Sequence, residues 1–300
     1  AIRRGPMAVP EDADDVFAID TTGETSEPYL RSSFPVDMSL LRLNKSGTQD
    51  TRVGTRLLQG KRLETNNTDT EATTGVHQFD YMNGWLSGVS TDAIAWMWRR
   101  APNYFDVVAY GATGETNPSV SHNLGVAPEM IWHKERNSTG SWSVAHSYDF
   151  TKRLVLNSTA AEVSYEFVTN ITDTSFNINF GGLGAENSTK IMYLFASLDG
   201  VSKVGSYTGN GTSQTIDCGF SSGARFVLIK RVTSAGANWY VFDTERGIVA
   251  GNDPVLYLNQ TQAQWSGTDY IDPDNSGFQV TGDANGVNDN GDTFIFYAIA

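Results

Sequence analysis

Internal repetition is the feature of this sequence that most constrains its fold. Segments of the middle of the chain recur roughly a hundred residues further on, as in Val107-Val-Ala-Tyr110 with Val204-Gly-Ser-Tyr207 and Met130-Ile-Trp-His-Lys134 with Phe226-Val-Leu-Ile-Lys230. A more degenerate copy precedes them, in which Leu63 to Glu71 matches Leu154 to Glu162. The repetition predicts three units, at residues 16–105, 106–202 and 203–300, after an N-terminal tail or linker at residues 1–15.

Within each unit the apolar residues recur mostly at every second position, which is typical of strands with one buried face. One such face reads Met130, Trp132, Lys134, and its counterparts are Met38, Leu40, Arg42 and Phe226, Leu228, Lys230. We therefore expect strands that are buried along their length and meet solvent at a cationic end. Hairpin turns are expected at sequences such as Asn210-Gly211.

No stretch shows helical periodicity with caps, so the predicted fold class is all-β. We expect three tandem antiparallel β-sandwich units of about 90–100 residues each, with jelly-roll or Greek-key pairing. The simplest arrangement is a row of three sandwiches joined by short connections. A pseudo-threefold ring is the alternative.

Charge and composition exclude several classes of partner. The net charge of −13 and the absence of a basic cluster argue against a nucleic-acid partner. Uncharged apolar runs such as Ala93 to Trp98 are too short to cross a bilayer, so we expect no membrane insertion. Cys218 is the only cysteine, which rules out an intrachain disulfide and favours a small buried strand residue.

The residues available for catalysis form no recognisable set. Four histidines are present, at positions 77, 122, 133 and 146, and none falls in a zinc motif or beside a nucleophile elbow. Paired carboxylates such as Asp243 and Glu245 have the chemistry that glycoside hydrolysis needs. Because Arg246 is adjacent, a surface turn with a local ion pair is the simpler interpretation. The sequence therefore predicts a protein that is not an enzyme.

One acidic segment suggests a cation site. Asp272, Asp274 and Ser276 place oxygens at alternating positions, Gly277 follows, and Asp283 stands at the twelfth place of the segment, as in a calcium-binding loop. A turn that is rich in Asp and Asn would have the same sequence without binding a cation. A calcium ion held by Asp272, Asp274 and Asp283 is thus the only cofactor the sequence suggests.

Tryptophan and asparagine raise the question of carbohydrate. Trp85 and Trp265 lie beside polar and glycine residues and are the candidate sugar-stacking residues, with a buried loop anchor as the alternative. Trp96, Trp98, Trp142 and Trp239 are expected in the core. Eight Asn-x-Ser/Thr triplets fit either glycosylation or turns, at Asn44, Asn66, Asn137, Asn157, Asn170, Asn187, Asn210 and Asn259.

Four runs carry a resemblance to a known family, namely Tyr104-Phe-Asp-Val-Val-Ala-Tyr110, Ser121 to Met130, Leu194 to Gly211 and Phe242-Asp-Thr-Glu-Arg-Gly247. They resemble a repeated β-rich domain of unknown function in tail-fibre-like and other virion structural proteins of marine bacteriophages. The resemblance extends over residues 16–300, is weakest in the first unit, and supplies no catalytic residue. Because such units sit beside concanavalin-like lectin modules, it implies a role in building a fibre or touching a host surface.

These observations lead to a functional hypothesis. We expect a bacteriophage virion structural protein at the particle surface, in a tail or head fibre that contacts host surface glycans. Its expected partners are other virion proteins and two further copies of itself in a homotrimer. Capsid decoration is the alternative within the structural class, and a surface polysaccharide depolymerase is the enzymatic one.

Overall fold

The computed structural model describes residues 8–73, 75, 77–88, 90–111, 115–179, 188–282 and 286–300. The described residues form β-strands and two short 3-10 turns, η1 (Ala13–Asp15) and η2 (Arg56–Leu58), and they contain no α-helix. All pairings between named strands are antiparallel. The all-β fold class is therefore confirmed.

The strands fall into three successive sets, which we call the first, second and third units. The first unit contains β1 (Phe17–Asp20), β2 (Leu30–Arg31), β3 (Met38–Arg42), β4 (Arg52–Thr55), β5 (Arg62–Glu64), β6 (His77–Gln78), β7 (Gly84–Ser87) and β8 (Ile94–Trp98). The second contains β9 (Phe105–Tyr110), β10 (Ser119–Ser121), β11 (Met130–Glu135), β12 (Ser143–His146), β13 (Lys152–Val155), β14 (Val163–Ser164), β15 (Val168–Thr169), β16 (Ser175–Ile178) and β17 (Lys190–Phe195). The third contains β18 (Ser202–Thr208), β19 (Gln214–Asp217), β20 (Phe226–Arg231), β21 (Trp239–Asp243), β22 (Leu256–Tyr257), β23 (Ile271–Asp274), β24 (Gly277–Val280) and β25 (Thr293–Ile299).

Strand order is the same in the three units, except that the large sheet of the second unit adds the edge strand β14. The large sheets run β1-β8-β3-β4-β5, β9-β17-β11-β12-β13-β14 and β18-β25-β20-β21-β22. The small sheets run β2-β7-β6, β10-β16-β15 and β19-β24-β23. In each large sheet the last strand of the unit pairs between its first and third strands, so every unit closes on itself before the chain continues.

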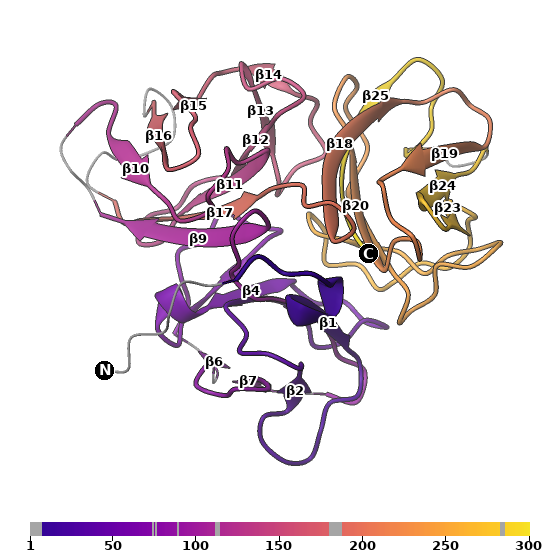
Figure 1. The fold of residues 1–300 in the computed structure, drawn as a ribbon. Helices are drawn as coiled ribbons and strands as arrows, with labels where there is room; N and C mark the ends of the chain where they lie inside the picture. Colours follow the sequence, from indigo (N-terminus) through magenta and orange to yellow (C-terminus); the bar gives the residue numbers. More distant parts are fainter. Residues whose placement is uncertain are drawn as a thin grey trace.

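The three units form a closed ring and not a row (Figure 1). Trp98 of the first unit packs edge-on against Phe226 of the third, with ring centroids 5.5 Å apart, and Phe195 of the second lies 5.0 Å from Tyr297 of the third. Trp98 also lies 6.5 Å from Phe105 of the second unit. The expectation of a row is therefore wrong, because aromatic contacts join all three pairs of units around one centre.

The ring buries both faces of the large sheets. In the second unit, Met130, Trp132 and Phe195 point into a central core shared by the three units. The intervening residues of β11 and β17, such as Ile131 and Met192, pack instead against the small sheet of their own unit. Alternation along these strands thus separates two cores, so the expectation of one buried and one solvated face does not hold for β3, β8, β11 or β17.

The cationic ends of the third strand of each large sheet are the clearest departure from expectation. Arg42, Lys134 and Lys230 have no exposed surface, although alternation predicts that they meet solvent. The reason is that the neighbouring unit of the ring covers the end of each strand. The ring therefore buries three cations at its seams.

Truncation at the centre of the ring should be costly. We expect Trp98→Ala to lower the free energy of unfolding by about 3–5 kcal/mol, because it removes a fully buried indole that contacts two other units. Urea denaturation followed by circular dichroism measures the change. The matched control is Trp265→Ala, which removes a half-exposed indole and should cost no more than about 1 kcal/mol. Equal losses in the two variants would contradict a central core shared by the units.

Candidate functional site

Matching backbone hydrogen bonds hold the three seams of the ring. Between the first and second units, Gly140 N donates to Thr68 O (2.9 Å) and Glu71 N to Arg136 O (2.7 Å). The second and third units are joined by Gly236 N to Thr159 O (2.8 Å) and Glu162 N to Val232 O (2.9 Å). The third and first units are joined by Gln49 N to Thr261 O (2.8 Å) and Gln264 N to Lys45 O (2.7 Å). Every unit thus gives one hairpin to one neighbour and one turn to the other.

The turns that accept these bonds are Asn-x-Thr triplets, starting at Asn66, Asn157 and Asn259. The side-chain oxygen of Asn157 accepts a hydrogen bond from Trp142 N, and that of Asn259 accepts one from Trp239 N, both at 2.9 Å. Asn66 instead donates to Asp50 at 2.8 Å. The triplets therefore have a structural role at the seams. Their shared register in the three copies was the sequence signal for it.

Two tryptophans reach across the seams that precede them. The Trp142 indole donates to Glu64 O of the first unit (2.8 Å), and the Trp239 indole donates to Val155 O of the second (3.1 Å). Thr51 stands at this position in the first unit, and its seam is completed by Arg42, which donates to Gln260 O (3.1 Å) and Gln262 O of the third unit. In this seam the long side chain of Arg42 thus takes the role that an indole has in the other two seams.

The ammonium groups of Lys134 and Lys230, two of the buried lysines, are stabilised by backbone carbonyl groups. Lys134 Nζ donates to Thr68 O (3.3 Å) and Glu135 O (3.1 Å), and Lys230 Nζ donates to Ala237 O (2.6 Å). Burial lowers the pKa of each lysine to about 8. The Lys230 ammonium thus holds the seam hairpin of its own unit, and the Lys134 ammonium also holds the Asn-x-Thr turn of the neighbouring unit.

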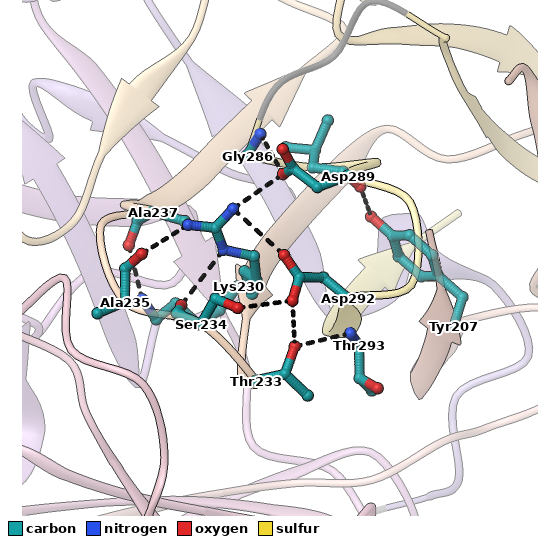
Figure 2. A network of polar contacts seen from close by, with 12 residues as sticks. Tyr207, Lys230, Thr233, Ser234, Ala235, Ala237, Gly286, Asp289, Asp292 and Thr293 are labelled. Atoms are coloured by element: carbon teal, nitrogen blue, oxygen red, sulfur yellow. Dashed lines mark hydrogen bonds and ion pairs between the residues drawn. The ribbon is translucent and has the colours of Figure 1, made fainter. Parts of the chain in front are cut away.

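A polar network supports the seam hairpin of the third unit, and Figure 2 shows it from close by. At its centre the Arg231 guanidinium contacts Asp289 (3.1 Å) and Asp292 (3.4 Å) and donates to Ser234 O (3.2 Å) and Ala235 O (2.6 Å). Asp292 in turn accepts from the Thr233 and Ser234 hydroxyls, both at 2.7 Å. The network thus fixes the hairpin to the loop before β25.

The second unit places the opposite charge at the same position. Glu135 accepts hydrogen bonds from the hydroxyls of Ser138 (2.6 Å) and Ser188, and Lys190 Nζ lies 3.9 Å from it. A central carboxylate with a cation here replaces a central guanidinium with two carboxylates in the third unit. In both units the charged side chains hold the seam hairpin in place.

Burial affects the pKa of three of the four histidines. Burial lowers the pKa of His133 to about 3 and that of His146 to about 4, and burial also lowers the pKa of His122. His77 stacks on Trp85 with ring centroids 5.8 Å apart. His133 corresponds to Ile229 in the third unit, which agrees with its interpretation as an ordinary strand residue.

The carboxylate pair considered for glycoside hydrolysis is separated by the fold. Asp243 is fully buried and accepts hydrogen bonds from Arg246 Nε (2.6 Å) and the Trp96 indole of the first unit (3.0 Å), whereas Glu245 is exposed. The local ion pair is present, but it lies inside a seam and not in the expected surface turn. Asp243 therefore cannot flank a glycosidic bond with Glu245.

The candidate calcium segment forms a hairpin between β23 and β24. Asp274 accepts hydrogen bonds from the backbone and the hydroxyl of Ser276 (2.8 and 2.7 Å), and Asp272 accepts one from Gly251 N (3.3 Å). Asp283 lies outside the described residues. Within the described residues no three metal-ligating side chains come together. The calcium site stays a prediction.

The structure separates the two tryptophans proposed to stack on sugars. Trp85 is fully buried in strand β7 and packs against Phe79 at 4.8 Å, so it is a core residue and neither a loop anchor nor a ligand platform. Trp265 is 53% exposed. Its backbone exchanges two hydrogen bonds with Val255 (2.8 and 3.0 Å), and its indole donates to the Thr268 hydroxyl (3.1 Å). Trp265 thus presents an aromatic face to solvent in a fixed position.

The single cysteine has the environment of a structural residue. Cys218 is buried, and burial raises the pKa of its thiol to about 12, as suits a structural residue. A membrane-spanning helix would need a long apolar run in helical conformation, and the described part of the chain has none.

Acid should destabilise the ring through its buried histidines. In the unfolded chain His133 and His146 bind protons below a pH of about 6.5, whereas in the folded protein they stay neutral down to their lowered pKa values. The free energy of unfolding is therefore highest above that pH, and it falls as the pH drops toward the pKa values of the folded protein. We expect a loss of about 2 kcal/mol per histidine at pH 5 relative to pH 7. Urea denaturation at a series of pH values measures it.

The control for this prediction is His133→Ile, which copies the third unit at this position. In this variant the loss of stability between pH 7 and pH 5 should be smaller by the contribution of one histidine. An unchanged pH dependence would contradict the prediction, because it would mean that the pKa of His133 is the same in the folded and unfolded states.

Comparison with protein families gives one match, to a family described as a domain of unknown function, DUF7483, over residues 59–300. The match begins directly after η2, so it takes in β5 to β8 of the first unit and all of the second and third. A search of curated proteins found no match. The matched region covers more than half of the chain, so the chain belongs to the DUF7483 family.

Proposed function

We propose that this protein is a non-enzymatic structural and binding component of a bacteriophage virion surface, in a tail or head fibre, and that it contacts host surface glycans. The observation that carries the glycan contact is the exposed, fixed indole of Trp265. Sugars stack their apolar faces on such rings. The virion context rests on the resemblance of the sequence to repeated domains in phage structural proteins.

The charge of the molecule supports a neutral glycan as partner. A net charge of −13 repels polyanions, and the buried cations at the seams are not available to attract them. The clusters of charged side chains described above are used within the ring. Attachment through an aromatic face and neutral hydrogen-bonding groups suits this surface better than attachment through ion pairs.

The glycan contact can be tested at Trp265. We expect the purified chain to bind immobilised host surface polysaccharide saturably, and Trp265→Ala to weaken binding about tenfold, which corresponds to about 1.4 kcal/mol. Biolayer interferometry measures the affinity. Val163→Ala is the matched control, because Val163 pairs with Arg153 as Trp265 pairs with Val255 and is also exposed, at 45%. Absence of saturable binding by the wild-type chain would overturn the proposal.

Capsid decoration is the second candidate, and the ring favours it. One chain places three sandwiches of equal strand order around one centre, so a single copy could sit on a threefold axis of a shell. This would replace the expected homotrimer by an intramolecular ring. A virion reconstruction is expected to show regular occupancy of threefold positions if the protein decorates the head, and density confined to fibres if it does not.

A further inference from the structure

A solvent-accessible cavity of about 440 Å³ lies in the first unit between η2 and β6. Arg56 and Gly60 line it on the side of the turn, and residues 77–80 line it on the side of the strand. Its volume falls within the range of roughly 300–1,000 Å³ found for small-molecule sites.

The same place in the third unit is filled by the protein itself. The loop between β21 and β22 is longer there, and the buried Asp253 carboxylate accepts hydrogen bonds from Tyr270 N (3.0 Å) and Ile271 N (2.9 Å), beside the edge strand β23. In the first unit β6 is the corresponding strand. The large-sheet bridges Val255 with Trp265 and Arg62 with Ala72 are equivalent, so Asp253 corresponds to Gly60.

Gly60 leaves the crevice open. A Cβ atom at this position would have its nearest neighbour, His77 O, at 3.8 Å, so there is room that no side chain of the turn occupies. The cavity is therefore the space that Asp253 and its loop take up in the third unit. The shorter connection between β4 and β5 creates it.

The lining of the cavity suits a neutral sugar. His77 and Phe79 lie along one wall of the cavity, where both are buried and fixed by stacking on Trp85, at 5.8 and 4.8 Å between ring centroids. Arg56 and Asp80 supply one charge of each sign, and Gln59 and Gln78 supply amide groups. Arg56 is also paired with Asp37 at 3.1 Å, so the cavity carries no excess positive charge for an anion.

We infer that this cavity is a second glycan site, which binds one neutral hexose unit of a saccharide. This inference rests on the proposed function and extends it from the surface of the third unit to a pocket in the first. Hydrogen-bond donors and acceptors around a cavity of this volume, with one charge of each sign, match the many hydroxyl groups of a neutral sugar.

The test is saturation-transfer NMR with D-glucose, D-galactose and D-mannose as neutral probes and D-glucuronate as the charged probe. It is performed on Trp265→Ala protein, so that the exposed indole does not contribute. We expect transfer to at least one neutral hexose. Adding Gln78→Phe, which places a ring in the mouth of the cavity, should reduce the transfer at least fivefold.

Thr169→Phe in the same background is the matched control, because Thr169 occupies the equivalent edge-strand position of the second unit. It should leave the transfer unchanged. Asp80→Ala is a second cavity variant with a small change at an exposed residue, and it should reduce the transfer even if Gln78→Phe fails to fold. No transfer to any neutral hexose, transfer to glucuronate alone, or equal transfer in the cavity variants and the control would overturn the inference. Polysaccharide binding that depends on Trp265 would still stand in those cases.

Discussion

Closing three sandwiches into a ring removes from water both the inner faces of the large sheets and the charged ends of their central strands. Arg42, Lys134 and Lys230 are fully buried as a result. A buried cation without hydrogen-bond partners costs several kcal/mol, so the ring can close only if carbonyl groups meet each one. These carbonyl groups belong to the Asn-x-Thr turns and the seam hairpins or lie next to them. The rest of the architecture depends on the hydrogen bonds that they accept.

The seams also show how repeated sequence tolerates divergence. Trp142 and Trp239 each send an indole across a seam, whereas the first unit has Thr51 there and uses the longer Arg42 to reach the neighbouring carbonyls. Glu135 and Arg231 carry opposite charges at one position, and each is surrounded by groups of the complementary kind. In all three units these polar groups at the seams have hydrogen-bond partners, but the residues that supply these partners differ.

Sequence could predict the parts of this structure that depend on local pattern. Alternating apolar residues and turn residues identify the strands and the all-β class, and Trp98 and Trp142 are core residues as expected. Local pattern favoured a row and left the ring as the alternative, since contacts that close the ring, such as Trp96 with Asp243, join residues far apart in the chain. For the same reason alternation placed Arg42 in solvent, and polar neighbours made Trp85 look as accessible as Trp265.

Divergence among the units also indicates where function should lie. Positions that serve the ring are constrained by their partners, even where the residue type changes. The crevice beside the edge strand of the small sheet has no such duty, because it is filled by Asp253 in the third unit and left empty beside Gly60 in the first. The exposed position of Trp265 carries only Val163 in the second unit. A ring whose seams hold it together can vary these outward positions without losing stability, so they are where a binding surface can arise.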